Sequence, residues 1–186
     1  PYRRQRQMCI RDSFRTDSEE ILRTIPIGNA LIYDLHFLPG NTLCVLCEDA
    51  LYFYELDGQC LGSYAFEDAY LKDYTLDGNG FVTLVMNLYK AGNGYTALTV
   101  GYDGTVLGTL PISEQILDIS ASGKYLALLT SGALSIYDQN VTEYDVSDNT
   151  TGASSAVMRE DGSAILLANG HGTLYVCLLY TSDAAD

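Results

Sequence analysis

Three aspartates in similar surroundings are the residues of this 186-residue chain best placed to do chemistry. Asp34, Asp73 and Asp118 each stand within a short apolar run: LIYDLHF, YLKDYTL and ILDIS. If these runs are strands that line one channel, the carboxylates form a ring of oxygen ligands suited to a cation. Alternatively, each Asp accepts backbone N–H hydrogen bonds from the next repeat unit. A ligand site rarely needs the same residue in every repeat, so we favour the structural role and assign no metal site.

The two histidines of the chain, His36 and His171, offer a second kind of chemistry. His36 follows Asp34 by two residues, so in a strand both side chains point to one face. The pair is either a metal or acid–base site or a hydrogen-bonded polar pair between repeats, and we favour the polar pair. His171, in NGHGT, is typical of a turn. No G-x-S-x-G nucleophile motif is present, and we predict no catalytic or cofactor-binding residue and no cofactor.

Cys44 and Cys47 form a C-x-x-C motif, which elsewhere serves as a redox pair or half of a zinc site. Here the motif lies in TLCVLCED, an apolar run that predicts a strand. Residues three apart in a strand point to opposite faces, and no second pair of ligands completes a zinc site. We therefore predict that both cysteines are small buried hydrophobes.

These residues belong to elements that repeat along the chain. Residues 21–27 (ILRTIPI) and 106–112 (VLGTLPI) are identical at four of seven positions, and residues 60–66 (CLGSYAF) keep the Leu-Gly-Ser/Thr core. Asp-Gly pairs at 57–58, 103–104 and 161–162 supply residues with positive φ for hairpin turns. Short strands repeating at a period of ~40 residues are typical of a β-propeller.

The fold class predicted is all-β, a partial β-propeller with about three complete four-stranded antiparallel blades and most of a fourth. One outer strand precedes the blades, which we place at residues 31–66, 70–112, 115–146 and 153–176. Each blade buries its faces only against its neighbours, so an open array leaves two apolar faces uncovered. We therefore expect the isolated chain to be marginally stable and prone to aggregate.

The two ends of the chain are related as opposite strands of one DNA sequence. Residues 177–186 (CLLYTSDAAD) back-translate to a string whose complement, slightly extended, encodes residues 3–12 (RRQRQMCIRD). The string resembles a transposase adapter used in sequencing libraries, including metagenomic ones. We therefore expect residues 1–13 and 177–186 to be adapter-derived and not native, and residues 14–176 to be part of a longer protein.

The net charge of −14 limits the possible partners. Four of the ten basic residues lie in the N-terminal adapter region, so the remaining chain is still more acidic in character. An acidic surface repels phosphate backbones and anionic lipid headgroups. We predict no nucleic-acid partner, and membrane association only through an anchor outside this piece.

The runs ISASGKYLALLTSGALSIYD and MREDGSAILLANGHGTLYV are similar to blade motifs of bacterial WD40-like and quinoprotein-like propellers. They more narrowly resemble an uncharacterised propeller family of anaerobic Gram-positive bacteria. Members of that family carry an N-terminal membrane anchor and an extracytoplasmic propeller, so the resemblance implies that localisation for the parent protein. The chain has no Trp, on which quinoprotein enzymes stack their cofactor. Tyr102-Asp103 and Tyr137-Asp138 stand near the Trp-Asp position of true WD40 repeats, but no regular Gly-His precedes them, so eukaryotic-type scaffolding is not favoured.

These observations favour a non-catalytic binding or scaffold module that takes an unknown protein or glycan partner. The alternative is part of a propeller enzyme, of glycosidase or lyase type, whose catalytic residues lie in blades outside this piece. A pair of carboxylates on the loops would favour the enzyme. Several tyrosines could line a peptide or glycan site, although packing between blades is their more common use: Tyr52, Tyr54, Tyr64, Tyr74, Tyr89, Tyr95 and Tyr102.

Overall fold

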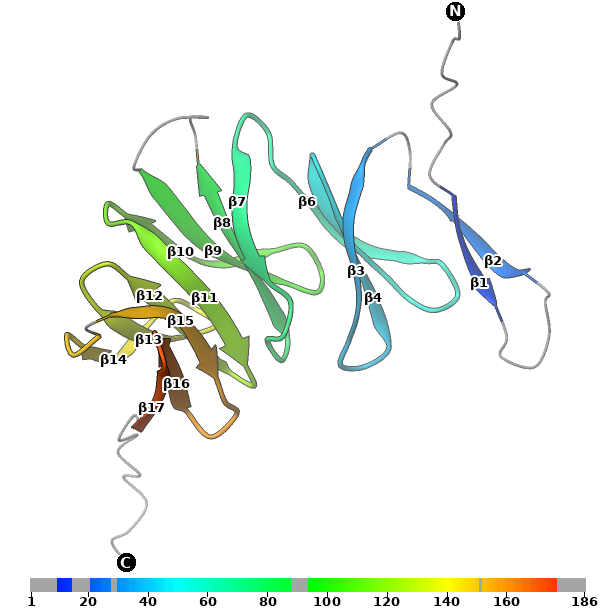
Figure 1. Cartoon of the computed structure of the whole chain (residues 1–186). Helices are drawn as coiled ribbons and strands as arrows, with labels where there is room; N and C mark the ends of the chain where they lie inside the picture. The colour runs from blue at the N-terminus through cyan, green and yellow to red at the C-terminus, as the bar shows by residue number, and fades with distance from the viewer. Residues whose placement is uncertain (1–9, 15–20, 28–29, 88–93, 151, 177–186) are drawn as a thin grey trace, which may run out of the picture. The chain divides into compact units, whose positions relative to one another are not determined.

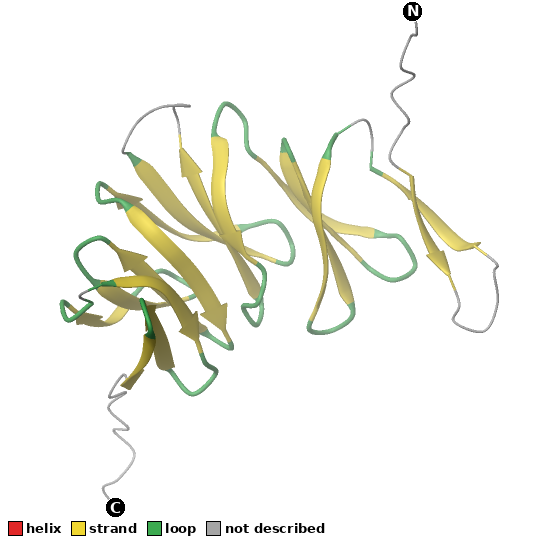
Figure 2. Ribbon diagram, viewed as in Figure 1, coloured by secondary structure: helices red, strands yellow, loops and turns green. Residues whose placement is uncertain are grey.

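The structure is a computed structural model in which all regular elements of the described residues are β-strands (Figure 2). Alternating and β-branched apolar runs, separated by Gly- and Asp-containing turns, explain why strands form throughout. The described residues are 10–14, 21–27, 30–87, 94–150 and 152–176.

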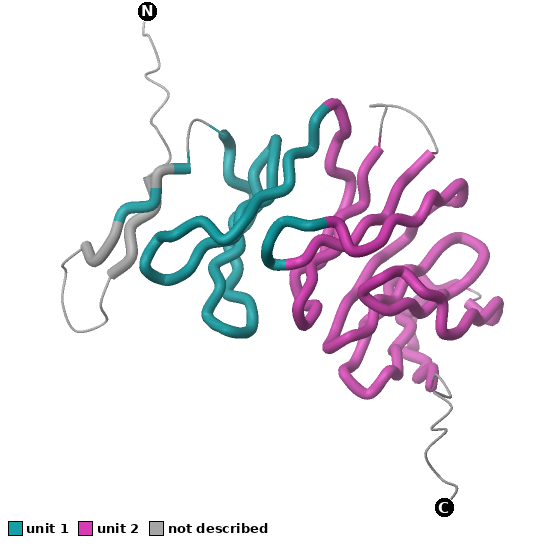
Figure 3. The backbone as a smooth tube through the Cα atoms, turned by 180° about the vertical axis from the view of Figure 1, so that it is seen from behind, with its two compact units in different colours: residues 1–67, 102–105 teal, residues 68–101, 106–186 magenta. Residues whose placement is uncertain are grey.

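The chain divides into two compact units, which are coloured separately in Figure 3. Unit 1 comprises residues 1–67 together with the turn at residues 102–105. Unit 2 comprises residues 68–101 and 106–186.

Unit 1 begins with a hairpin of β1 (Ile10–Phe14) and β2 (Ile21–Pro26), which pair antiparallel (Figure 1). β1 falls largely in the stretch that we expect to be adapter-derived. β2 corresponds to the predicted outer strand. The hairpin is followed by a four-stranded antiparallel sheet in sequential order, formed by β3 (Ile32–Leu38), β4 (Thr42–Cys47), β5 (Ala50–Tyr54) and β6 (Cys60–Ala65).

Unit 2 holds three further antiparallel sheets with the same sequential order of strands. The first contains β7 (Tyr70–Thr75), β8 (Phe81–Asn87), β9 (Tyr95–Gly101) and β10 (Val106–Ile112). The second contains β11 (Ile116–Ser122), β12 (Tyr125–Thr130), β13 (Leu134–Asp138) and β14 (Glu143–Ser147).

The last sheet of unit 2 has three strands in the described part of the chain. They are β15 (Ala153–Met158), β16 (Ser163–Ala168) and β17 (His171–Val176). β17 pairs only with β16, so one of its edges carries no further strand among the described residues. The three complete sheets and the partial one confirm the predicted number and type of strands.

The second strands β8 and β12 are buried on both faces, as their near-continuous apolar sequences predict. All residues of β8 and of β12 are buried. Their side chains form two apolar clusters between neighbouring sheets of unit 2. Phe81 and Val85 of β8 pack with Leu126 and Leu128 of β12. The opposite face of β12 packs against Ala156 and Met158 of β15, among others.

The Asp-Gly turns have the backbone conformation that the sequence predicts. Gly58, Gly104 and Gly162 have φ angles of 89°, 82° and 85°, where a side chain would be strained. Asp57 and Asp103 accept N–H bonds from the residue two positions later, which closes each turn. The predicted turn chemistry is therefore confirmed at these positions.

The glycine of the Leu-Gly-Ser/Thr repeat is required for a different reason, which is close packing. A Cβ atom on Gly108 would lie 2.5 Å from the carbonyl oxygen of Asn140, in the turn between β13 and β14. Gly62 in unit 1 is in the same situation, because its Cβ would overlap the backbone of Asp103. In both cases the fourth strand of a sheet lies directly against a hairpin turn, and only Gly leaves room for that approach.

Candidate functional site

The three repeated aspartates occupy the same local structure in their sheets. In β3, β7 and β11 the register shifts directly before the Asp, which is the signature of a β-bulge that redirects the side chain. Each Oδ1 atom then accepts the N–H of the following residue, at 2.7 Å from Leu35, 2.9 Å from Tyr74 and 3.0 Å from Ile119.

Asp118 also makes the contact to the next sheet that the structural interpretation predicts. Its Oδ2 atom accepts the backbone N–H of Ala156 at 2.8 Å and a short hydrogen bond from the hydroxyl of Ser155. Two residues further along β11, the hydroxyl oxygen of Ser120 accepts the N–H of Met158 at 3.0 Å. These bonds join β11 to β15, so the Asp-x-Ser pair fixes one sheet against the next.

Asp73 makes a different contact from Asp118. Burial raises the pKa of its carboxyl, the negative charge of Asp118 raises it further, and the N–H bond from Tyr74 acts in the opposite direction. Thr75, in the position of Ser120, accepts the N–H of Ala121 at 3.4 Å. The packing of β7 against β11 therefore keeps the contact between a hydroxyl and an N–H group. Asp118 itself meets the hydroxyl of Ser155, whereas Asp73 meets the carboxylate of Asp118.

No group of three or more metal-ligating side chains lies together within the described residues. Asp34 and His36 are both half-buried on β3, with the alternating burial of a strand. His171 is the first residue of β17 and is exposed. The turn that we predicted for His171 therefore ends one residue earlier, because the positive φ of Gly170 completes it.

Cys44 and Cys47 lie in β4 with no exposed surface, and both are free thiols. Burial, with smaller contributions from Asp34 and Cys47, raises the pKa of the Cys44 thiol to about 12. A thiol with such a pKa holds almost no nucleophilic thiolate at neutral pH. The prediction of buried, apolar cysteines is confirmed.

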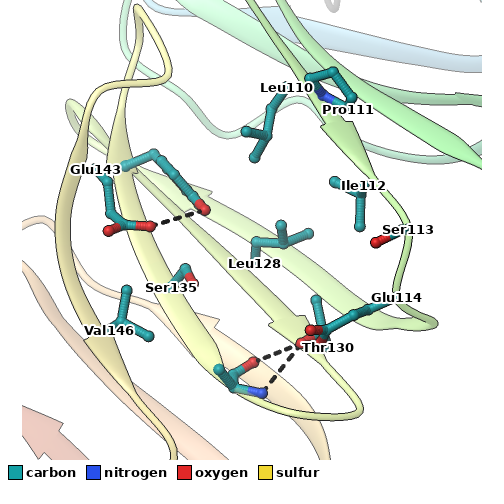
Figure 4. Close-up of a pocket in the computed structure, with 12 residues that line it drawn as sticks. Leu110, Pro111, Ile112, Ser113, Glu114, Leu128, Thr130, Ser135, Glu143 and Val146 are labelled. Atoms are coloured by element: carbon teal, nitrogen blue, oxygen red, sulfur yellow. Dashed lines mark hydrogen bonds between the residues drawn. The ribbon is translucent and has the colours of Figure 1, made fainter.

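Unit 2 contains a pocket of about 310 Å³ between β10 and the sheet β11–β14 (Figure 4). Its apolar wall includes Leu110, Ile112 and Leu128, of which the last two are buried. Glu114, in the connection from β10 to β11, and Glu143, the first residue of β14, supply its charged groups. Among the described residues, no Lys, Arg or His lines the pocket.

Both glutamates are held by hydroxyl groups of the pocket wall. Thr130, at the end of β12, donates its hydroxyl to Oε2 of Glu114 at 2.7 Å. Tyr137 of β13 donates to Oε2 of Glu143 at 3.4 Å (Figure 4). Burial raises the pKa of the Tyr137 hydroxyl and Glu143 raises it as well, so this phenol stays protonated and remains a donor. The two carboxylates are thus oriented acceptors on an apolar floor.

The tyrosines considered for a peptide or glycan site are used mostly for packing in the part of the chain that the structure describes. The rings of Tyr52 and Tyr54 stack at 6.3 Å, and Tyr102 lies 5.8 Å from Phe53, all within unit 1. Tyr64 packs 6.2 Å from Phe66. Tyr89 lies outside the described residues.

The sequence did not point to Glu114 or Glu143. Neither belongs to a motif, and they are 29 positions apart in a chain rich in acids. They line the same pocket only because the end of the sheet β7–β10 packs against the sheet β11–β14. No search for spacing or composition would have selected them.

The comparisons with known proteins concern the fold. No protein-family model and no curated protein matches the chain. The WD40 β-propeller domain of Doa1 is similar in structure, with a TM-score of 0.53 and 11% identity, over 90% of this chain and 57% of that chain. Two further structures have lower TM-scores: a calcium-binding regucalcin from Agrobacterium tumefaciens (0.48; 14% identity; 75% of this chain, 54% of that chain) and a protein of unknown function from Bacteroides caccae (0.45; 10%; 85% and 61%).

The four consecutive sheets and the likeness to a WD40 domain define the class of protein. The chain is a partial β-propeller, and its described residues form three complete four-stranded blades and three strands of a fourth. It spans between about half and three fifths of the length of these three structures. No helix in the described residues is long and apolar enough to cross a membrane.

Proposed function

We propose that the chain is a non-catalytic binding module and that the pocket between β10 and the blade β11–β14 receives its ligand. The observation that carries the proposal is the pocket itself, with two oriented carboxylates above an apolar floor. Its volume of about 310 Å³ lies at the lower end of the range of roughly 300–1,000 Å³ for small-molecule sites.

The chemistry of the pocket favours a ligand that combines an apolar body with a cationic group. Glu114 and Glu143 attract positive charge, and no basic side chain among the described lining residues competes. The net charge of −14 adds to the attraction. A Lys or Arg side chain of a partner protein fits this description. A glycan fits less well, because the one aromatic side chain of the pocket, Tyr137, is only 7% exposed and offers no open ring face.

An enzymatic role is the competing proposal, since the pocket holds two carboxylates. The groups around them support binding instead. Glu114 and Glu143 could themselves serve as acid and base, but each accepts a hydroxyl hydrogen bond, and the described lining residues include no His, Lys or Cys beside them.

We propose further that the parent protein is bacterial, membrane-anchored and extracytoplasmic. The support for this proposal is the resemblance of the repeat motifs to the propeller family of anaerobic Gram-positive bacteria. In that setting the pocket would meet soluble peptides or the surface of a partner protein.

Benzylamine is a suitable probe, because it joins an aromatic ring to an ammonium group, and benzyl alcohol is its neutral counterpart. We expect titration calorimetry to show millimolar binding of benzylamine, which corresponds to about 4 kcal/mol. Glu114→Gln and Glu143→Gln should each weaken it roughly two- to five-fold, as expected for an exposed ion pair of up to about 1 kcal/mol.

Glu160→Gln is the matched control, because Glu160 is exposed in unit 2 and does not line the pocket. This variant should bind benzylamine as the unaltered chain does. Equal binding of benzyl alcohol, or equal weakening by all three substitutions, would show that the pocket does not recognise cations.

A further inference from the structure

Three threonines form a row across the sheet β7–β10 in unit 2. Thr75 of β7 pairs with Thr83 of β8, and Thr83 pairs with Thr99 of β9, three strands that lie next to one another (Figure 1). Residues directly opposite in antiparallel strands share one face of the sheet, with Cβ atoms about 4.5–5.5 Å apart. Thr75 is 7% exposed and the other two are 0% exposed. The three hydroxyl groups are therefore neighbours in a place that bulk water does not reach.

The face that carries the row packs against the blade β11–β14. Phe81 and Val85 precede and follow Thr83 by two residues, so they lie on the same face of β8. Both belong to the apolar cluster that joins the two sheets, together with Leu126 and Leu128 of β12. The row of hydroxyls is thus part of an interface between two blades that is otherwise apolar around its centre.

The outer members of the row form hydrogen bonds across this interface. Thr75 accepts the N–H of Ala121 of β11 at 3.4 Å. Thr99 donates its hydroxyl to the carbonyl oxygen of Gln139, in the turn between β13 and β14, at 2.5 Å. Each of these two threonines therefore has a polar partner on the neighbouring blade.

Thr83, in the middle of the row, has no such bond. Its hydroxyl has no hydrogen-bond partner among the described residues, although its side chain is fully buried. A buried hydroxyl without a partner destabilises the folded state relative to an apolar side chain of the same shape. The other residues of β8 up to Met86 are all apolar, so a valine would suit the strand equally well. The hydroxyl of Thr83 therefore calls for a partner, and polar groups too far apart for a direct bond are commonly joined by water.

We propose that an internal water molecule binds between Thr83 and Thr99. The hydroxyl hydrogen of Thr99 goes to Gln139, and its oxygen accepts no hydrogen bond that we observe among the described residues. The oxygen of Thr75, in contrast, already accepts an N–H. Thr83 thus donates its hydroxyl to the water, and the water donates to the oxygen of Thr99.

The bound water joins the centre of one blade to the turn of the next. The hydrogen bonds run from Thr83 through the water to Thr99 and on to the carbonyl of Gln139. A fully satisfied polar network inside an apolar interface fixes one arrangement of its elements, because any other arrangement leaves a polar group unpaired. The water therefore sets the register between the two blades. It is separate from the ligand pocket, whose described lining includes none of the three threonines.

A crystal structure of the full chain at a resolution that shows ordered water tests the site directly. We expect a water oxygen within about 3.2 Å of Oγ1 of both Thr83 and Thr99. The same crystals of Thr83→Val should lack it. A site without density, or a direct hydrogen bond between the two hydroxyls, would overturn the proposal.

Urea denaturation tests the site in solution through Thr83→Val, which keeps the shape of the side chain and removes the hydroxyl. We expect the unfolding equilibrium constant to rise roughly three- to ten-fold, because the bonds through the water are lost. An unchanged or lower constant would show that the hydroxyl has no partner and would also overturn the proposal. Thr109→Val is the matched control, because Thr109 is an exposed threonine of β10 in the same sheet. It should change the constant less than about two-fold.

A double variant tests whether the water touches both threonines. Once Thr83→Val has displaced the water, Thr99→Val removes only the bond to Gln139. Its effect on the unfolding constant should then be smaller than in the unaltered chain by at least roughly two-fold. If the effects of the two single variants multiply to that of the double variant, the water does not join them. Circular dichroism spectra of all variants check that the blades are folded.

Discussion

The blade β11–β14 and the blade β15–β17 differ in how many faces they bury, although both are copies of the same repeat. Leu129 pairs with Asp118 and is fully buried, whereas Leu167 pairs with Ser155 in the same register and is 42% exposed. The residue type and the strand position are identical, and only the neighbours differ. Burial in this chain is therefore a property of the stack of blades, which no single repeat determines.

The largest expected effect compares the same substitution at these two leucines. Leu129→Ala leaves a cavity between two blades and should lower the free energy of unfolding by about 2–5 kcal/mol. Leu167→Ala removes a partly exposed side chain and should cost well under half as much. Urea denaturation of both variants measures the difference. Equal losses would mean that Leu167 is covered in solution.

A smaller effect is expected for the polar contact between these two blades. Asp118→Ala leaves the N–H of Ala156 and the hydroxyl of Ser155 without their acceptor and should cost about 1–3 kcal/mol. Asp73→Ala is the matched control, because the carboxylate of Asp73 bonds only the N–H of Tyr74 among the hydrogen bonds that we observe. Urea midpoints that fall equally for the two variants would contradict a special role for Asp118.

The smallest effect concerns the two facing acids and depends on pH. Folding raises the pKa of the Asp73 carboxyl, so the folded state holds this proton more tightly than the unfolded state does. The folded protein therefore becomes less stable as the pH rises from the unfolded value through the raised one. Asp73→Asn should therefore have a higher Tm than the unaltered chain at pH 7. The advantage should vanish below about pH 3.9, the ordinary value for Asp, where both states are protonated.

A double variant connects this pH effect to its cause. Because the charge of Asp118 contributes to the raised pKa of Asp73, Asp73→Asn should stabilise an Asp118→Asn background less than it stabilises the unaltered chain. Thermal melts at pH 7 of the four proteins in the cycle are sufficient. An unchanged gain would assign the whole effect to burial.

Much of the fold could be predicted from periodicity and turn chemistry. The apolar second strands, the Asp-Gly turns and the outer strand β2 all follow from local sequence, and the structure confirms them. His171 was misplaced by one residue, because a turn ends where hydrogen bonding resumes and sequence marks that boundary poorly. The candidate pocket could not be predicted. Glu114 and Glu143 carry no shared motif, and they are brought together by the packing of one blade's last strand against the next blade.

The sequence alone determined that this chain forms repeated antiparallel blades, because hydrophobic alternation and positive-φ turns act over a few residues. It also determined that Asp34, Asp73 and Asp118 occupy equivalent positions. Only the tertiary structure decided what those positions do: Asp118 meets a serine hydroxyl and an N–H, while Asp73 meets the charge of another acid. The reason is that a carboxylate's role depends on the groups that face it, and those groups come from the neighbouring blade.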